Sequence, residues 1–159
     1  MKILKLRKNN IEEIEQVAKI LYDWWGKNSK ISFERMKKIV ESRCSDKDYP
    51  QVLVVKRNNE VIGTISLVAN DIELRQDLFP IITQVFVKEC YRKQKIATTL
   101  INTLLSDVLP KFNTIYLTTT LNNFYEKFGF EFVEESDVWF ENEKIIREKI
   151  YKIEKKWEN

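Results

Sequence analysis

The sequence has 159 residues, of which 43% are hydrophobic and 12% aromatic, so it is long and apolar enough for a packed domain, and wholesale disorder is excluded. The formal net charge is +3, with 27 basic and 24 acidic residues interleaved along the chain, and this balance argues against a nucleic-acid partner. The absence of histidine excludes Ser-His-Asp and Cys-His nucleophile systems and His-based metal sites.

The first predicted element is a strand near residues 3–6. Residues 1–7 alternate charged and apolar side chains, which is typical of an edge strand and not of a signal peptide. No later apolar run approaches the length of a membrane span. Cys44 and Cys90 are too few for a thiolate metal site and are expected to be reduced. We therefore expect a cytoplasmic protein with no membrane partner and no bound metal.

Two helices are predicted next. Apolar residues recur at helical spacing from Ile11 to Trp25, and Asn10 is a candidate N-cap. The residues expected on the buried face are Ile11, Ile14, Val17, Ala18, Leu21, Tyr22 and Trp25. A second helix is predicted over 32–44, with Ser32 as its N-cap.

The remaining elements complete an α/β pattern. Further strands are predicted at residues 52–55, 61–68, 81–87, 114–119, 130–133 and 145–153. A long helix is predicted after the third of these strands, with the apolar stripe Ile96, Leu100, Ile101, Leu104, Leu105 and Val108. A short helix is predicted over 122–128, closed by Gly129 as a left-handed C-cap. This order predicts a mixed sheet with helices packed on it, in a single domain over 1–159.

A short cationic turn lies between the strand at 81–87 and the long helix. It contains Arg92, Lys93 and Lys95. The first N–H groups of a helix have no acceptor within it, and the helix dipole adds positive potential at the same end. A strand, a cationic turn and a helix N-terminus in this order predict a phosphate-binding site. The alternative, a solvated basic turn, is weaker because both flanking elements agree with the motif.

The segments Arg92-Lys93-Gln94-Lys95-Ile96-Ala97 and Asn122-Asn123-Phe124-Tyr125-Glu126-Lys127-Phe128-Gly129-Phe130 together resemble the GNAT superfamily of acetyl-CoA-dependent N-acetyltransferases. The family signature is Arg or Gln, two variable residues, Gly, one variable residue, and Gly or Ala. Arg92 and Ala97 match it, whereas Lys95 replaces the glycine that approaches the pyrophosphate with positive φ. The lysine adds a charge beside the phosphates, and we expect acetyl-CoA binding to be retained.

The resemblance covers about residues 52–133 and implies a GNAT-like acyl-CoA N-acyltransferase fold, a mixed, mostly antiparallel twisted sheet flanked by helices. It implies acetyl-CoA as co-substrate, with the pantetheine arm paired like an added strand to the backbone of Val85, Phe86 and Val87. The residues implied to hold the pyrophosphate are Arg92, Lys93, Gln94, Lys95, Ile96, Ala97 and Thr98. Asn123 is a further candidate for cofactor contact, although Asn122 or Asn123 could equally cap the short helix.

Proton transfer is the second requirement of the chemistry that the resemblance implies. Tyr125 matches the family's thiolate-protonating tyrosine, and a phenol with a pKa of about 10 suits that role. The alternative is an aromatic ring that only packs under the sheet. Family members often carry a glutamate early in the strand before the signature, but residues 81–84 contain no carboxylate. Asp71 and Glu73 could act through water, yet solvated side chains are the more common case.

The function expected from the resemblance is N-acetylation of a primary amine, on a small-molecule or peptide acceptor, by direct attack. One alternative is a non-catalytic acyl-CoA-binding regulatory module, and another is an acetyltransferase acting on aminoacyl-tRNA, which the small net charge disfavours. One of Trp24 and Trp25 must face away from the core, where it lines the acceptor pocket or, as we favour, packs between the helices and the sheet. The sequence leaves the oligomeric state open, a homodimer included.

Overall fold

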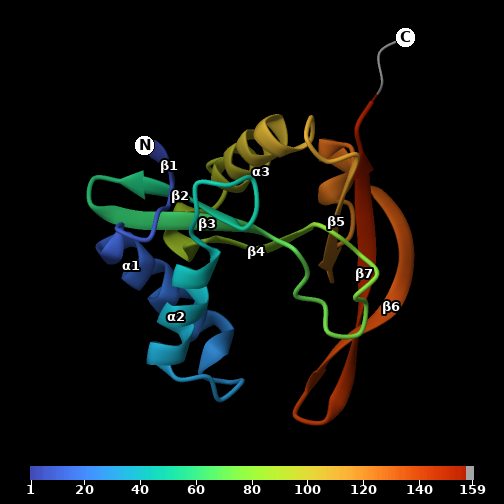
Figure 1. The fold of residues 1–159 in the computed structure, drawn as a ribbon, viewed down its shortest axis with the longest axis horizontal. Coiled ribbons are helices and arrows are strands. Elements are labelled where there is room, and N and C mark those ends of the chain that lie inside the picture. The colour runs from blue at the N-terminus through green and yellow to red at the C-terminus, as the bar shows by residue number, and fades with distance from the viewer. Residues whose placement is uncertain (157–159) are drawn as a thin grey trace.

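The computed structural model describes residues 1–156 and contains a seven-stranded sheet in the order β1-β2-β3-β4-β5-β7-β6 (Figure 1). The strands are β1 (Lys2–Lys5), β2 (Gln51–Arg57), β3 (Glu60–Val68), β4 (Ile81–Val87), β5 (Thr114–Thr119), β6 (Glu131–Glu141) and β7 (Lys144–Glu154). Neighbouring strands pair antiparallel except β4 and β5, which are parallel. The predicted mixed, mostly antiparallel sheet is therefore confirmed.

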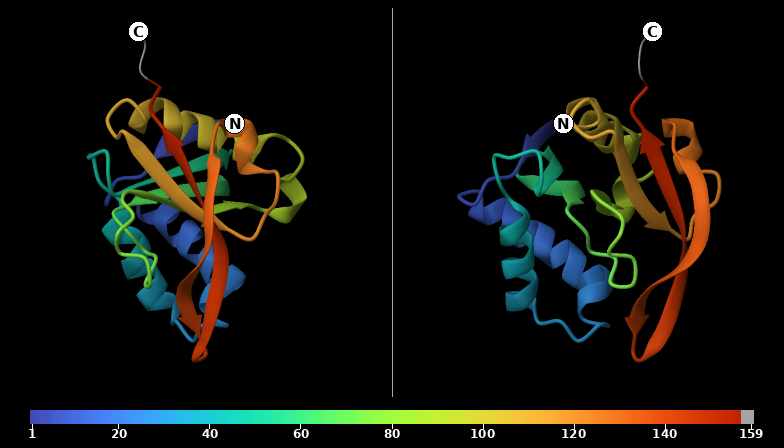
Figure 2. Two further views of the ribbon diagram at one scale, coloured as in Figure 1. Left: turned by 90° about the vertical axis from the view of Figure 1, so that its right-hand side faces the viewer. Right: turned by 45° about the vertical axis from the view of Figure 1, so that its right-hand side comes forward.

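The helices cover both faces of the sheet. They are α1 (Ile11–Leu21), α2 (Phe33–Arg43) and α3 (Ile96–Val108), with a π-helix at Tyr22–Gly26 and 3₁₀ helices at Glu89–Tyr91 and Tyr125–Phe128. Successive side chains of a strand point to opposite faces. Val52 and Val54 of β2 pack with α1 and α2, whereas Leu53 and Val55 pack with α3. Accordingly, α1 and α2 lie on the face opposite α3 (Figures 1 and 2).

The packing of α3 fixes the position of the cationic turn. Every residue of the predicted stripe from Ile96 to Val108 is buried, as expected. Burial of such side chains stabilises the fold by about 1.5–3 kcal/mol each relative to exposure. Gly63 of β3 lets the first turns of the helix approach closely, because a Cβ there would lie 3.1 Å from Ile96 Cγ2 and 3.3 Å from Leu100 Cδ1.

The N-terminal helices follow the prediction with three differences. Ile11, expected on the buried face, is 70% exposed, because it is the first helical residue and projects beyond the core. Regular α-helix ends at Leu21, and the expected continuation to Trp25 is a π-helix. Asn10 occupies the N-cap position, but its side chain accepts a hydrogen bond from Arg7 N (2.8 Å) instead of from the helix. Ser32 caps α2 as predicted.

The sheet divides between β4 and β5. Their register contains a single residue pair, Ile81 with Tyr116, in the described part of the chain. β4 also carries a register shift against β3, next to Gln84, whose φ is +56°. A bulge of this kind bends a strand and re-aims its side chains. Beyond Ile81, the side of β4 that faces β5 is therefore without a strand partner.

The C-terminal hairpin is longer than predicted. Residues 130–133 were expected as a short strand, but β6 continues to Glu141 and pairs with β7 along its length. The acidic residues within β6 do not form an apolar pattern that predicts a strand, because the strand is exposed. Its strand conformation depends on pairing with β7 in the folded protein. Figure 2 shows the hairpin standing apart from α1 and α2, with the segment that follows β3 between them.

Candidate active site

The cationic turn presents unpaired amide groups at the start of α3. Lys95 occupies the N-cap with φ +62° and ψ +23°, the left-handed conformation that glycine adopts most readily, and Lys93 also has a positive φ of +64°. The N–H of Thr99 bonds to Lys95 O at 3.0 Å. The N–H groups from Gln94 to Thr98 find no acceptor among residues 1–156. An anion bound here would satisfy them.

Lys95→Gly is expected to raise the free energy of unfolding by about 1 kcal/mol, because glycine avoids the steric cost of the left-handed conformation. Lys95→Ala is the matched control, since it removes the same charge but retains the Cβ. Urea unfolding of the two variants measures the difference. Both should bind coenzyme A with a weaker salt dependence than the wild type. Equal stability of the glycine and alanine variants would contradict this account of the turn.

Strand β4 and the turn are joined by Arg92. Its Nε donates to Val87 O at 2.9 Å, and its guanidinium lies 5.4 Å from the centre of the Phe86 ring. Trp24, from the π-helix, contacts the same ring at a centroid distance of 4.9 Å and is 46% exposed. Trp25 packs against the α1–α2 core. Trp24 is thus the member of the pair that faces outward, beside β4.

Tyr125 lies on the α3 side of the sheet. It is 7% exposed and belongs to the same core cluster as Ile96, with Val85 packed against that cluster. Burial raises the pKa of Tyr125 to about 12, so the phenol is protonated at neutral pH. Its hydroxyl makes no hydrogen bond to another residue in the described part of the chain. The geometry leaves a protonated donor without a protein acceptor.

The segment before Tyr125 differs from the prediction. Instead of a helix over 122–128, a 3₁₀ helix begins at Tyr125, and its N-cap position is Phe124 with no side-chain cap. Asn123 has a φ of +58° and is exposed, so neither predicted asparagine cap is formed. The chain instead turns sharply to bring the ring of Phe124 against that of Tyr125, 4.9 Å between centroids. Gly129 has φ +99°, which confirms the left-handed C-cap.

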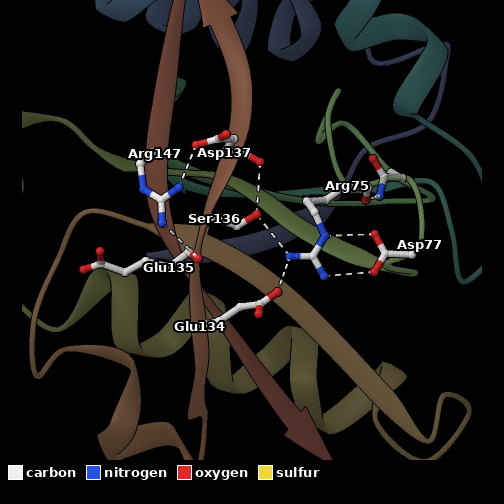
Figure 3. Close-up of polar contacts among 8 residues, drawn as sticks. Arg75, Asp77, Glu134, Glu135, Ser136, Asp137 and Arg147 are labelled. Carbon is white, nitrogen blue, oxygen red and sulfur yellow. Dashed lines mark hydrogen bonds and ion pairs between the residues drawn. The ribbon is translucent and has the colours of Figure 1, made fainter.

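Residues 69–80, called the strap below, connect β3 to β4 and lie against β6. Arg75 is at the centre of this contact, between Asp77 on one side and Glu134 and Ser136 on the other (Figure 3). Its Nε and Nη2 donate to the two carboxylate oxygens of Asp77 at 3.0 and 2.9 Å. Its Nη1 donates to Ser136 Oγ at 3.1 Å and pairs with Glu134. One side chain thus ties the strap to the hairpin.

Backbone and apolar contacts support the same attachment. Leu74 N donates to Val138 O at 2.9 Å, and Glu73 Oε1 accepts from Phe140 N at 3.2 Å. A small buried cluster lies beneath the strap, formed by Val68, Ile72, Leu78, Ile81, Val138 and Ile150. Glu73, weighed above as a proton acceptor, therefore serves to anchor the strap to β6.

A carboxylate that the sequence analysis did not consider lies at the β5 edge of the split. Glu148 of β7 is half-buried, and its Oε1 accepts a hydrogen bond from Thr118 Oγ1 of β5 at 2.9 Å. Burial, together with the nearby charge of Asp71, raises the pKa of Glu148, while the Thr118 bond opposes this shift. A signal was present in the alternation Ile146, Glu148, Ile150, which places an acid at an inward position of a strand.

Comparison with known proteins decides the family. A model described as an acetyltransferase (GNAT) domain matches residues 48–132, more than half of the 159-residue chain. The chain belongs to the GNAT acetyltransferase family. No curated protein matches the sequence.

Several solved GNAT structures share the whole fold. An aminoglycoside 6′-N-acetyltransferase complexed with coenzyme A superposes with a TM-score of 0.75 at 18% identity, covering 100% of this chain and 99% of the other. An aminoglycoside 6′-acetyltransferase type Ii gives 0.74 at 20% identity, with 100% of both chains covered. An N-acetyltransferase from Staphylococcus aureus Mu50 gives 0.71 at 13% identity, covering 98% and 100%. These likenesses confirm the GNAT fold.

No helix among residues 1–156 is long and apolar enough to cross a membrane. The same residues contain no group of three or more His, Cys, Asp or Glu side chains placed to hold a metal ion. Cys44 is buried, Cys90 is exposed, and both are free thiols.

The structure brings the predicted GNAT site residues together in part. Ile96 and Ala97 pack in the same cluster as Val85 and Tyr125, on the α3 side of the split. Arg92, Lys93, Gln94 and Lys95 are exposed around the start of the helix, and Thr98 is half-buried. Phe86 faces the opposite side, with the α1–α2 core. Asn123 makes no contact that links it to the turn within the described residues. Unpaired amides surrounded by cations fit a diphosphate group.

Proposed function

We propose that this GNAT protein transfers the acetyl group of acetyl-CoA to a primary amine by direct attack of the nitrogen. The observation that carries this proposal is the split between β4 and β5, which leaves the β5-facing edge of β4 without a strand partner from beyond Ile81 to the cationic turn. An extended pantetheine arm along β4 would find strand backbone without a neighbour. Its diphosphate would then reach the amides from Gln94 to Thr98 and the charges of Lys93 and Lys95.

The expected chemistry follows from the protonation states. The amine nitrogen forms a bond to the acetyl carbon, the C–S bond breaks, and the departing thiolate takes a proton. Tyr125 supplies that proton, because its buried phenol is neutral at pH 7 and has no protein acceptor among the described residues. No covalent acyl-enzyme is required, since a free amine is itself a competent nucleophile once it has lost its proton.

The proposed reaction requires an acceptor with a primary amine. A small-molecule or peptide amine satisfies it, and aminoglycosides are candidates because similar folds include two aminoglycoside acetyltransferases. The outward-facing Trp24, beside β4, supplies an aromatic surface for such an acceptor.

The test combines calorimetry with an assay of thiol release. Titration of coenzyme A is expected to give saturable binding, and acetyl-CoA is expected to release thiol in the presence of kanamycin, spermidine or a short peptide with a free N-terminus. Binding without transfer to any of these amines would support the regulatory module instead. A flat titration at millimolar ligand, which corresponds to a binding free energy weaker than about −4 kcal/mol, would overturn both readings.

A further inference from the structure

The proposed reaction needs a proton acceptor that β4 does not provide. An alkylamine is mostly protonated at neutral pH, so one proton must leave the nitrogen before or during attack. The β4 residues Ile81, Ile82, Thr83 and Gln84 contain no carboxylate. Glu73 is engaged with the backbone of β6. Any carboxylate that acts here must reach the split from another element.

Glu148 approaches the split from β7. Its hydrogen-bond partner Thr118 lies two residues beyond Tyr116, the last β5 residue that is paired with β4. Thr118 is thus on the part of β5 that has separated from β4. The carboxylate is therefore held at the β5 edge of the opening, near its narrow end.

Glu148 and Tyr125 lie on opposite faces of the sheet. Leu117 of β5 packs in the cluster that contains Tyr125, so its neighbour Thr118 points to the other face. Ile150, two residues after Glu148, packs in the small cluster beneath the strap, on that other face. A thioester lying in the split would thus have a proton donor on the α3 side and a carboxylate on the strap side.

The surroundings of Glu148 favour proton uptake. Three elements contribute groups around Glu148: Thr118 on β5, Asp71 on the strap and Ser136 on β6. Ser136 is the cross-strand neighbour of Glu148, and its hydroxyl accepts a hydrogen bond from Arg75. The charge of Asp71 and partial burial both raise the pKa of the carboxyl, which makes it a stronger base than an exposed glutamate. The charge of Arg43, at the end of α2, acts on Asp71.

We propose that Glu148 accepts the proton released by the acceptor amine, directly or through one water molecule, while Thr118 orients the carboxylate. This inference rests on the proposed acetyl transfer. The ammonium proton passes to Glu148, and the neutral nitrogen then forms the N–C bond as the C–S bond breaks. Tyr125 protonates the departing thiolate, and the second nitrogen proton restores the phenol of Tyr125. Exchange of the Glu148 proton with solvent completes the cycle, so an ammonium ion and acetyl-CoA yield an amide, a thiol and one proton.

The experiment measures pH–rate profiles with the panel amine that turns over fastest. Glu148→Gln keeps an oxygen that can accept from Thr118 but cannot act as a base. Its kcat/KM at pH 7 is expected to fall about 100-fold, with the deficit shrinking as pH rises and free amine accumulates. The dissociation constant for coenzyme A, measured by calorimetry, is expected to be unchanged.

Two further variants separate a chemical role from a structural one. Asp71→Asn removes a charge that raises the Glu148 pKa, so the acidic limb of the profile should move to lower pH. Thr118→Val removes a hydrogen bond that lowers the same pKa, so the limb should move to higher pH. Loss of packing alone does not produce opposite shifts.

Outcomes of this experiment distinguish the inference from the proposed function. A Glu148→Gln enzyme with the wild-type rate and profile, or limb positions that do not move in the other two variants, would remove Glu148 from the reaction and leave acetyl transfer intact. Wild-type protein that binds coenzyme A but acetylates no panel amine would overturn the proposed function, and the role of Glu148 with it.

Discussion

Replacing Tyr125 with phenylalanine is expected to lower kcat for acetyl transfer by about 100-fold, with binding of coenzyme A nearly unchanged. The phenol is neutral at physiological pH, because burial raises the pKa of Tyr125 to about 12. It can therefore donate to a departing thiolate, whereas phenylalanine cannot. The ring itself is preserved, so its contacts with Phe124, Phe128, Phe130 and Tyr151 remain.

The matched control is Tyr151→Phe. Tyr151 is buried in the same aromatic group, 6.5 Å from Tyr125 between ring centroids, and the substitution removes only its hydroxyl, which is a hydrogen-bond partner of Glu126. Its kcat is expected to stay within about twofold of the wild type. Steady-state assays and thermal unfolding of both variants provide the measurements. A Tyr125→Phe enzyme as fast as Tyr151→Phe would assign the residue to packing alone.

Replacing Arg75 with glutamine is expected to reduce the free energy of unfolding by about 2 kcal/mol and turnover by about tenfold. The Arg75 side chain is 21% exposed and links Asp77 to Glu134 and Ser136, so its loss weakens the attachment of the strap to β6. The half-exposed carboxylates keep the cost below that of a buried network. Turnover falls because the strap carries Asp71, which tunes Glu148.

Arg147→Gln offers a closely matched control. Arg147 bonds to Asp137 at 2.8 Å and to the Glu135 carbonyl at 3.4 Å, so its contacts stay within the β6–β7 hairpin (Figure 3). We expect a loss of no more than about 1 kcal/mol and normal turnover. Hydrogen exchange of the Leu74 amide, which bonds to Val138 O, should accelerate in the Arg75 variant alone. Equal exchange in the two variants would show that Arg75 does not hold the strap.

The elements with strong apolar periodicity were predictable. The stripe of α3 repeats at helical spacing over three turns, and β4 is rich in β-branched and aromatic residues on both sides of Thr83 and Gln84, so both were found with near-correct bounds. β6 was mostly missed, because an exposed strand with the run Glu134-Glu135-Ser136-Asp137 has neither pattern. Its strand conformation is fixed by pairing with β7, which no local signal encodes.

The candidate site was predictable only where its chemistry is contiguous in sequence. The cationic turn was predicted from the neighbouring residues Arg92, Lys93 and Lys95. Tyr125 was predicted from the sequence motif around it. The candidate role of Glu148 depends instead on its contact with Thr118, which is 30 residues away in the sequence, and on the charge of Asp71 in the strap. Only the folded topology brings these residues close to Glu148. The left-handed backbone of Lys95 was indicated only by the resemblance, in which a glycine occupies this position, since lysine itself does not signal positive φ.

The split between β4 and β5 has a consequence for the stability of the protein. The amino-terminal and carboxy-terminal parts of the molecule meet across β4 and β5 through one backbone pair, so the free protein lacks a continuous ladder at its middle. An extended ligand that forms hydrogen bonds with the backbone on both sides of the split would connect the two parts of the sheet. The affinity for such a ligand and the cooperativity of unfolding are then linked, because the hydrogen bonds that hold the ligand also connect the two parts of the protein.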